Sequence, residues 1–219
     1  LNLTNLNCGC FLDGLFFNIM KNPMEKQILE AHRKIMSCIH HTPVLTNAYL
    51  NKLSGADLYF KCENFQKMGA FKMRGAMHKL LSISESQLSK GVVTHSSGNF
   101  AQALALAAKN LNVDAYIVMP ENAPNVKKEA VLNYGGKIIE CRPTLASREE
   151  TADKVQHETG AVFCHPYNDM DVIMGNSSCA LELLNEVKDL NDIIAPVGGG
   201  GLLSGTALTA KTFSAELKI

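Results

Sequence analysis

The stretch GVVTHSSGNFAQALALAAKNLNVDAYIVM, residues 91–119, carries the alternation that decides the fold. It begins with a short apolar run at 91–95 and ends with another at 115–119, and both have the length and composition of buried strands. The residues between them, 99–110, are long enough for a helix and follow its period. A strand, a helix and a strand in this order predict two parallel strands joined by a right-handed crossover.

The same alternation continues on both sides of this unit. Short apolar runs separated by helical stretches predict a doubly wound α/β fold, in which ligands bind beyond the carboxyl ends of the strands. We expect strands at 58–62, 91–95, 115–119, 137–140, 161–164 and 193–197. We expect helices at 71–81, 99–110, 125–134, 145–159, 172–187 and 202–213, and an earlier amphipathic helix that begins at Met24 and ends before Pro43.

Composition and charge narrow the class of protein. Hydrophobic residues make up 46% of the chain and charged residues 19%, which is typical of a globular protein. The 21 basic and 21 acidic side chains cancel, so no overall field favours nucleic acid or an acidic membrane surface. No apolar run approaches the roughly 18 residues of a membrane span, so we expect no membrane segment.

The cysteines and the start of the chain give two further expectations. The seven cysteines are scattered, and neither C-x-x-C nor H-E-x-x-H occurs. This pattern indicates reduced thiols in a cytoplasmic protein and no metal centre. Residues 1–23 follow neither a helical nor a strand period, so we expect a leader or a misassigned start there.

The glycine run Gly198–Gly201 follows the apolar run at 193–197 and precedes an apolar helix expected from Leu202. Glycine tolerates backbone angles that turn successive N–H groups toward one point, and a helix N-terminus adds partial positive charge. The run therefore predicts a phosphate cradle, with a plain flexible turn as the alternative. It is not a dinucleotide fingerprint, because Leu203 and Ser204 stand where the third glycine would fall.

A second loop follows the strand expected at 91–95 and opens the next helix. It consists of Ser96, Ser97, Gly98 and Asn99. Its hydroxyls and carboxamide can hold a carboxylate, but Ser and Asn are also preferred helix N-caps. On spacing alone, capping is the stronger interpretation, and only the position above a strand favours a ligand.

Lys72 lies between the apolar Phe71 and Met73 at the start of the helix expected at 71–81. A lysine partly removed from water has a lowered pKa and can act as an amine nucleophile or a base at neutral pH. Most lysines instead lie on solvated helix surfaces. The residues alone do not decide between these two interpretations.

Three segments together carry a family resemblance: residues 61–76, residues 94–102 and residues 196–205, the last of which reads PVGGGGLLSG. In order and spacing they closely resemble the fold-type II pyridoxal-phosphate enzymes, specifically the serine/threonine ammonia-lyase (dehydratase) and serine racemase group. The resemblance runs from about Met24 to Ile219.

The resemblance implies two doubly wound parallel-sheet domains. The large domain would comprise 24–85 and 169–219, and the small domain 86–168. Family members continue for about a hundred residues past the position of Ile219, so we expect a C-terminally truncated chain whose larger domain is incomplete. The resemblance also implies a homodimer and allows a divalent cation, for which we find no ligands in this sequence.

The resemblance further implies roles for the residues singled out above. Lys72 matches the lysine that forms the Schiff base with pyridoxal 5'-phosphate, and Gly198–Gly201 match the loop that binds the cofactor phosphate. Asn99 matches the asparagine that hydrogen-bonds the ring hydroxyl, while Ser96, Ser97 and Asn99 match the loop that closes on the substrate carboxylate. Ser97 also matches the serine that, in racemases of this group, faces Cα from the side opposite Lys72.

The activity implied is dehydration and deamination of L-threonine or L-serine to a 2-oxo acid and ammonia. Serine racemisation is the alternative, because both outcomes begin with loss of the Cα proton. An alternative of another class is an inactive fragment or pseudoenzyme that retains a phosphate-binding loop. The expected partner is a small amino acid substrate, and neither nucleic acid nor membrane is expected.

Two departures from the family pattern accompany these matches. Phe100 stands where the family usually has histidine, which removes a polar group near the substrate carboxylate or the cofactor. Asn176, Ser177 and Ser178 replace the usual Gln-Gly-Thr, and we expect this to alter the start of the helix near the cofactor.

Overall fold

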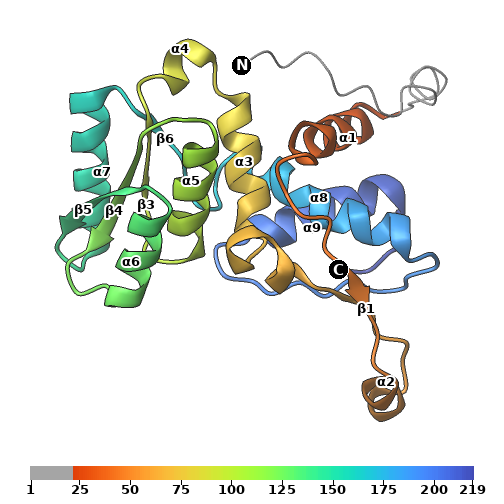
Figure 1. Ribbon diagram of the computed structural model, residues 1–219. Helices are drawn as coiled ribbons and strands as arrows, with labels where there is room; N and C mark the ends of the chain where they lie inside the picture. The colour runs from red at the N-terminus through yellow and green to blue at the C-terminus, as the bar shows by residue number, and fades with distance from the viewer. Residues whose placement is uncertain (1–21) are drawn as a thin grey trace.

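The computed structural model describes residues 22–219 (Figure 1). Of the leader expected at 1–23, it describes Asn22 and Pro23, and the remainder lies outside the described residues. The Asn22 side chain caps helix α1, Pro23–Ile35, by accepting a hydrogen bond from the Met24 N–H. Within residues 22–219, no helix combines the length and the apolar character that crossing a bilayer requires.

A four-stranded parallel sheet, in the order β5-β4-β3-β6, forms one lobe of the structure, the sheet lobe. Both pairings of the central strand β3, with β4 and with β6, are parallel. The βα alternation is thus confirmed, and with it the α/β fold class. The strands are β3 Val92–His95, β4 Ala115–Pro120, β5 Lys137–Cys141 and β6 Val162–Phe163. The connecting helices are α5 Asn99–Asn110, α6 Asn125–Asn133 and α7 Leu145–Thr159.

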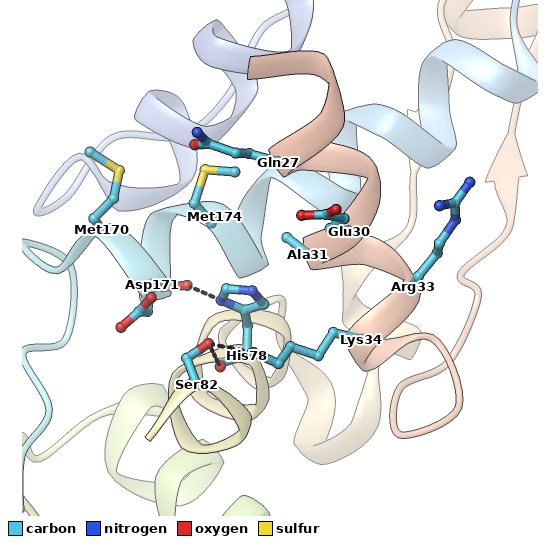
Figure 2. A pocket seen from close by; sticks show the side chains of 10 residues that line it. All are labelled: Gln27, Glu30, Ala31, Arg33, Lys34, His78, Ser82, Met170, Asp171 and Met174. Carbon is cyan, nitrogen blue, oxygen red and sulfur yellow. Dashed lines mark hydrogen bonds between the residues drawn. The ribbon is translucent and has the colours of Figure 1, made fainter. Parts of the chain in front are cut away.

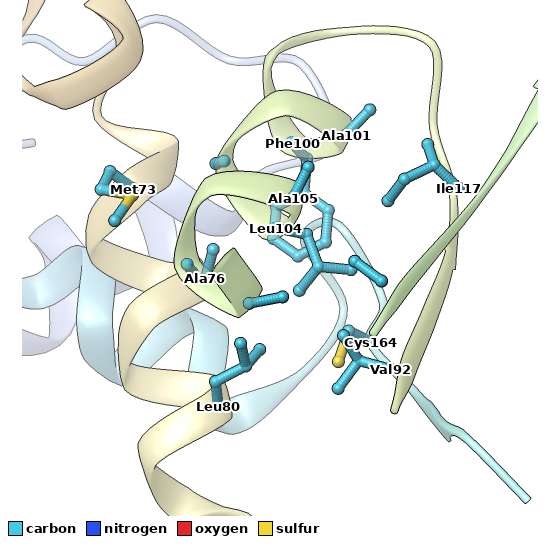
Figure 3. Close-up of a cluster of buried hydrophobic side chains, with 14 of the residues drawn as sticks. Met73, Ala76, Leu80, Val92, Phe100, Ala101, Leu104, Ala105, Ile117 and Cys164 are labelled. Atoms are coloured by element: carbon cyan, nitrogen blue, oxygen red, sulfur yellow. The ribbon is translucent and has the colours of Figure 1, made fainter. Parts of the chain in front are cut away.

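The two faces of this sheet bury different helices, because successive side chains of a strand point to opposite faces. On one face, Val92 and Ile117 pack in the same cluster as Leu104 of α5 (Figure 3). On the other face, Val93 and Val118 pack with residues of α7. Helices therefore cover both faces, which is the doubly wound arrangement expected from the sequence.

Helix α3, Lys72–Ser82, runs between the sheet lobe and a helical lobe and contacts helices of both (Figure 1). The helical lobe consists of α1, α8 Met170–Glu186 and α9 Gly201–Phe213. Residues 73–78 of α3 are all buried. Close packing against α8 depends on glycine, because a Cβ at Gly175 would lie 2.4 Å from the Arg74 carbonyl oxygen.

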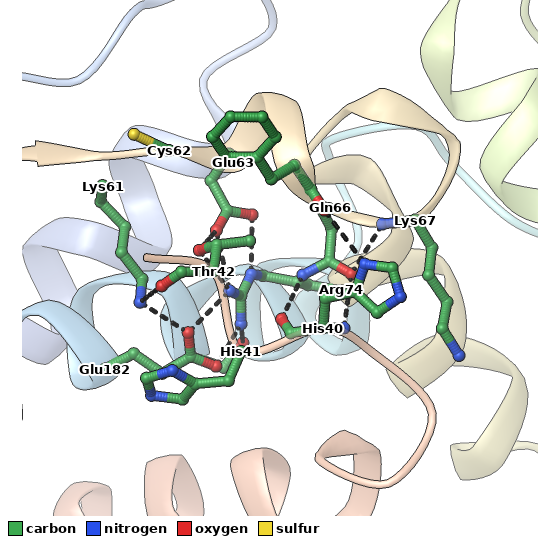
Figure 4. Close-up of polar contacts among 12 residues, drawn as sticks. His40, His41, Thr42, Lys61, Cys62, Glu63, Gln66, Lys67, Arg74 and Glu182 are labelled. Atoms are coloured by element: carbon green, nitrogen blue, oxygen red, sulfur yellow. Dashed lines mark hydrogen bonds and ion pairs between the residues drawn. The ribbon is translucent and has the colours of Figure 1, made fainter. Parts of the chain in front are cut away.

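Arg74, fully buried in α3, is the centre of an ion-pair network (Figure 4). Its guanidinium donates to both carboxylate oxygens of Glu63 at 2.8 Å and to those of Glu182 at 2.7 and 2.8 Å. Lys61 adds an ion pair to Glu182 at 2.8 Å. Two cations thus face two carboxylates, which balances the charge that burial would otherwise make costly.

The pKa values of the network follow from these contacts. Burial acts to lower the pKa of Arg74, but hydrogen bonds to Glu63 and Glu182 outweigh it and hold the pKa above its ordinary value. Burial acts to raise the pKa of Glu182, but Arg74 and Lys61 outweigh it and hold that pKa below its ordinary value. Both groups are therefore charged in the folded protein at neutral pH.

Several elements between α1 and β3 differ from those expected from the sequence. The strand expected at 58–62 is reduced to β2, Phe60–Lys61, which pairs antiparallel with β1, Val44–Leu45. This short pairing is local to the segment before α3 and does not extend the parallel sheet. The sequence did not predict β1, the helices α2 Ala48–Ser54 and α4 Glu85–Leu88, or the 3-10 turns at Glu63–Phe65 and Lys67–Gly69.

The strand expected at 193–197 does not form within the described residues. Asp192 makes a single parallel bridge to Lys218, and Ile194 is 95% exposed. A strand persists where neighbouring strands pair with its backbone N–H and C=O groups along its length, and among residues 22–219 this segment pairs only at its start, where the Ile193 N–H donates to the Lys218 carbonyl oxygen. The second parallel sheet that the resemblance implies is therefore not formed among them.

We expected the substitution at Asn176, Ser177 and Ser178 to lie at the start of a helix, and this expectation is wrong. These residues are fully buried in the interior of α8, which begins at Met170. The Ser177 and Ser178 hydroxyls donate to the carbonyl oxygens three residues earlier, at 2.6 and 2.7 Å. The helix starts earlier than expected because the Asp169 side chain accepts hydrogen bonds from the first N–H groups of α8.

Replacing Gly175 by alanine should separate α3 from α8. Because the added methyl would meet backbone at 2.4 Å, we expect Gly175→Ala to lower the free energy of unfolding by about 1–3 kcal/mol. Chemical denaturation measures this change. Asn185→Ala, an exposed position on the same helix, should change it by less than about 0.5 kcal/mol. Equal effects of the two substitutions would contradict the close packing of these helices.

Removing Glu182 should leave two buried cations, Arg74 and Lys61, with Glu63 as the remaining carboxylate at the centre of the network. We expect Glu182→Ala to cost about 3–5 kcal/mol of unfolding free energy. Glu186→Ala is the matched control, because Glu186 also pairs with Lys61, at 2.9 Å, but is partly exposed. The control should cost at most about 1 kcal/mol.

The same network gives a pH dependence. The folded-state pKa of Glu182 is lowered, so its contribution to stability is complete above the unfolded-state pKa, near about 4.3, and is lost as the pH falls through the folded-state pKa. In denaturation titrations, the unfolding free energy of the wild type should therefore fall more steeply in acid than that of Glu182→Ala. Parallel pH profiles would contradict this assignment.

Candidate active site

Lys72 is the first residue of α3 and is half-buried. Its Nζ donates to the Pro166 carbonyl oxygen at 2.7 Å and lies 5.1 Å from the ring centroid of Phe71 and 5.7 Å from that of Phe100. Burial lowers the pKa of Lys72, because desolvation disfavours the charged amine. The amine is therefore more readily deprotonated than a solvated lysine.

The glycine run Gly198–Gly201 leads directly into α9. Gly200 is the N-cap residue of this helix, at φ +88°, and no side chain caps the helix. A Cβ at Gly199 would lie 2.2 Å from the Tyr167 ring, whereas a Cβ added at Gly198 or Gly200 would meet no atom within 4 Å. One side of the loop is thus packed against Tyr167, and the other side has room for a ligand.

This loop has the properties that a phosphate requires. The first N–H groups of a helix have no acceptor within the helix, and its N-terminus carries partial positive charge. Because no side chain caps α9, these donors are available to an anion beside the open positions Gly198 and Gly200.

The serine loop lies between β3 and α5. Gly98 is the N-cap residue of α5, and no side chain caps the helix, so the capping interpretation of Ser96, Ser97 and Asn99 is wrong. Within the loop, the Gly98 N–H donates to the Ser96 hydroxyl at 3.4 Å. The N-terminus of α5 is thus also uncapped, which suits a substrate carboxylate.

The topology of the sheet places the serine loop, after β3, next to the turn that follows β6. β3 and β6 are neighbours, but α5 leaves β3 on one face of the sheet whereas α7 approaches β6 from the other. Ligands of doubly wound folds bind at such a switch point, beyond the carboxyl ends of the two strands. His95, at the end of β3, lies 5.3 Å from the Phe163 ring and 6.0 Å from the His165 ring, as measured between centroids.

The turn after β6 lies between Lys72, the glycine loop and the serine loop. The Pro166 carbonyl accepts the Lys72 hydrogen bond, Tyr167 packs on the glycine loop, and His165 contacts His95, which directly precedes the serine loop. This turn was not among the sites expected from the sequence. The signal was present, however, because His165 follows an expected strand as closely as Ser96 does.

Phe100 follows the serine loop, and its side chain is 2% exposed in the main hydrophobic cluster (Figure 3). The side chain that stands in place of the family's usual histidine is thus part of the core. One face of its ring is close to the Lys72 amine, where it offers a cation–π contact.

A groove of about 620 Å³ lies elsewhere, between α1, α3 and α8 (Figure 2). It is lined in part by His78, whose Nδ1 lies 2.7 Å from the Asp171 carbonyl oxygen, and by Met174. Neither Lys72 nor the serine and glycine loops line it. This groove is therefore separate from the candidate active site.

Comparisons with known proteins identify relatives of this chain. A family model described as pyridoxal-phosphate dependent enzyme matches residues 35–219. Among curated proteins, the chain is 50% identical over 197 residues to a β-hydroxyaspartate dehydratase from Paracoccus denitrificans, covering 90% of this chain and 62% of that protein. It is also 50% identical over 194 residues to a serine racemase from Dictyostelium discoideum, covering 89% of this chain and 60% of that protein.

Solved structures show the same likeness. The structure of the Dictyostelium discoideum serine racemase superposes with a TM-score of 0.86, covering 88% of this chain and 63% of that one. The threonine deaminase of T.th., 40% identical, superposes with a TM-score of 0.82, covering 88% of this chain and 63% of that one. The chain thus spans about three fifths of the length of these relatives. It belongs to the pyridoxal-phosphate-dependent enzyme family, within the group of serine racemases and dehydratases.

Proposed function

We propose that this protein removes the Cα proton of a small hydroxyamino acid and catalyses racemisation of serine. The observation that carries the proposal is that one turn joins the half-buried Lys72 amine to the uncapped glycine loop: its Pro166 carbonyl accepts from Lys72, and its Tyr167 packs on the loop. Two curated relatives support racemisation in particular: the serine racemases of Dictyostelium discoideum and Arabidopsis thaliana are 50% and 53% identical to this chain.

The residues present fit pyridoxal phosphate. Gly198–Gly201 and the N-terminus of α9 would hold the phosphate, Lys72 would hold the aldehyde carbon and Asn99 the ring hydroxyl. When bound, this cofactor supplies an electron sink for the negative charge that develops at Cα of an amino acid.

Lys72 serves as the base that accepts the Cα proton. Burial lowers the pKa of this amine, so the neutral form that a base requires is reached more readily than in a solvated lysine. The Pro166 carbonyl, at 2.7 Å, accepts a hydrogen bond from the amine and so fixes its position.

The serine loop binds and orients the substrate. Its Ser96 and Ser97 hydroxyls and the uncapped N–H groups at the start of α5 are donors for a carboxylate. We assign to Ser97 the return of a proton to Cα from the side opposite Lys72, which racemisation needs and dehydration does not.

Dehydration is the second candidate activity. Loss of the β-hydroxyl as water after removal of the Cα proton converts L-serine or L-threonine to an enamine. Water then hydrolyses the imine tautomer of this enamine to a 2-oxo acid and ammonia. The likeness to a β-hydroxyaspartate dehydratase and to a threonine deaminase supports it. The two activities share Lys72 and differ in their need for Ser97.

Lys72→Ala should abolish covalent capture of the cofactor. We expect the wild-type chain, incubated with pyridoxal phosphate, to develop a near-visible absorbance band that borohydride fixes to the protein. The mutant should lose this band, because no other amine is held at this position, whereas Lys67→Ala in the same segment should keep it. A folded wild type without a Lys72-dependent band would leave a non-catalytic phosphate-binding protein as the better interpretation.

Ser97→Ala should separate the two activities. If Ser97 returns the proton, its loss should lower D-serine formation from L-serine by about 100-fold or more, the usual contribution of a general acid or base. Pyruvate formation should fall much less. Chiral chromatography and a pyruvate assay on the same samples measure both products, with the exposed Ser86→Ala as control. An equal loss of both products would show that Ser97 serves substrate binding instead.

A further inference from the structure

In the turn formed by His165, Pro166, Tyr167 and Asn168, the Pro166 carbonyl holds the Lys72 amine, but the side chains of the turn have no role in the function proposed above. It connects β6 to α8 and contacts both Lys72 and the glycine loop. The largest side chain in this turn is that of Tyr167, which is 40% exposed. A large side chain kept partly exposed beside a candidate binding loop calls for a physical reason.

The turn is held firmly at both ends. The His165 Nδ1 accepts hydrogen bonds from the Asn168 N–H at 2.8 Å and from the Tyr167 N–H at 3.3 Å. The His165 and Tyr167 rings meet edge to face, with centroids 4.5 Å apart. Immediately after the turn, Asp169 caps α8 and forms an ion pair with Lys79 of α3 at 2.9 Å.

Tyr167 explains why position 199 is glycine. Gly199 is not among the glycines with a positive φ, so its backbone conformation does not require glycine. A Cβ at this position would instead lie 2.2 and 2.3 Å from two carbons of the Tyr167 ring. A Cβ at Gly201 would lie 3.1 Å from the Tyr167 Cα and carbonyl oxygen. Tyr167 is thus one wall of the glycine loop.

We propose that Tyr167 is a positioning residue that holds the glycine loop in the shape that receives a phosphate group. Four successive glycines lose much conformational freedom when they are ordered, and an anion that must order them binds more weakly. Tyr167 packs against alternate members, Gly199 and Gly201, and leaves Gly198 and Gly200 open. The loop is therefore ordered before the ligand arrives, which increases affinity.

This inference rests on the proposed function, and its test compares two probes. Pyridoxal phosphate carries the phosphate and pyridoxal does not, and both react with Lys72 through an aldehyde. Pyridoxal also forms an internal hemiacetal in water, which weakens its binding by the same factor in every variant. A change between variants in the ratio of the two dissociation constants therefore measures a change in the contribution of the phosphate. We expect Tyr167→Ala to reduce this preference for the phosphorylated probe by about tenfold or more, while the affinity for pyridoxal changes little. Tyr167→Phe, which keeps the ring, should retain the wild-type ratio.

A double-mutant cycle tests the contact itself. Gly199→Ala alone should displace the ring and reduce the phosphate preference. In Gly199→Ala with Tyr167→Ala the collision is absent, so the double variant should be no worse than Tyr167→Ala alone. Tyr49→Ala, on the exposed helix α2, should combine additively with Gly199→Ala. If Tyr167→Ala does not fold, as judged by circular dichroism, Gly199→Ala must show the loss of phosphate preference by itself.

Two results would overturn the proposal. An equal fall in affinity for both probes would show that Tyr167 supports the site as a whole, and unchanged affinities would show that the loop is ordered without it. If the wild type binds neither probe through Lys72, the proposed function fails, and calorimetric titration with inorganic phosphate then decides about Tyr167. Weaker phosphate binding by Tyr167→Ala supports the inference, whereas equal or absent binding in both proteins refutes it.

Discussion

The buried ion pairs of Arg74 are the interaction on which the rest of the structure depends. Arg74 lies two residues after Lys72 in α3 and is held by Glu63 on the preceding segment and by Glu182 on α8. A fully buried guanidinium is stable only where paired carboxylates offset the loss of water. These contacts fix the start of α3 relative to α8, and so they also fix the place from which Lys72 extends toward the sheet lobe.

The second constraint is the strand order of the sheet. Because β6 lies next to β3 and not beyond β5, the turn at 165–168 meets the serine loop at the same edge of the sheet. That turn then reaches across to Lys72 and to the glycine loop in the helical lobe. A site assembled from four separate segments thus depends on one short connection, whose conformation His165 stabilises.

The candidate site would attract anions through groups within the site itself, because the formal charges of the whole chain cancel. Two uncapped helix N-termini, those of α5 and α9, present N–H groups that suit anionic groups. Lys72 adds an amine whose pKa is lowered by burial. Backbone dipoles can therefore bind anions here without a cluster of basic side chains that would raise the overall charge.

The sequence by itself determined the elements and the chemistry of single segments. Apolar periodicity identified the strands and helices of the sheet lobe, because periodicity is a local property. Residue type made Lys72 and Gly198–Gly201 candidates, and the family resemblance supplied their expected roles. The tertiary structure decided what depends on distant neighbours: that 193–197 is not a strand among the described residues, that Ser96 and Asn99 do not cap α5, and that Tyr167 packs on the glycine loop. Pairing and packing arise between segments far apart in the chain, and local periodicity carries no information about which of them meet.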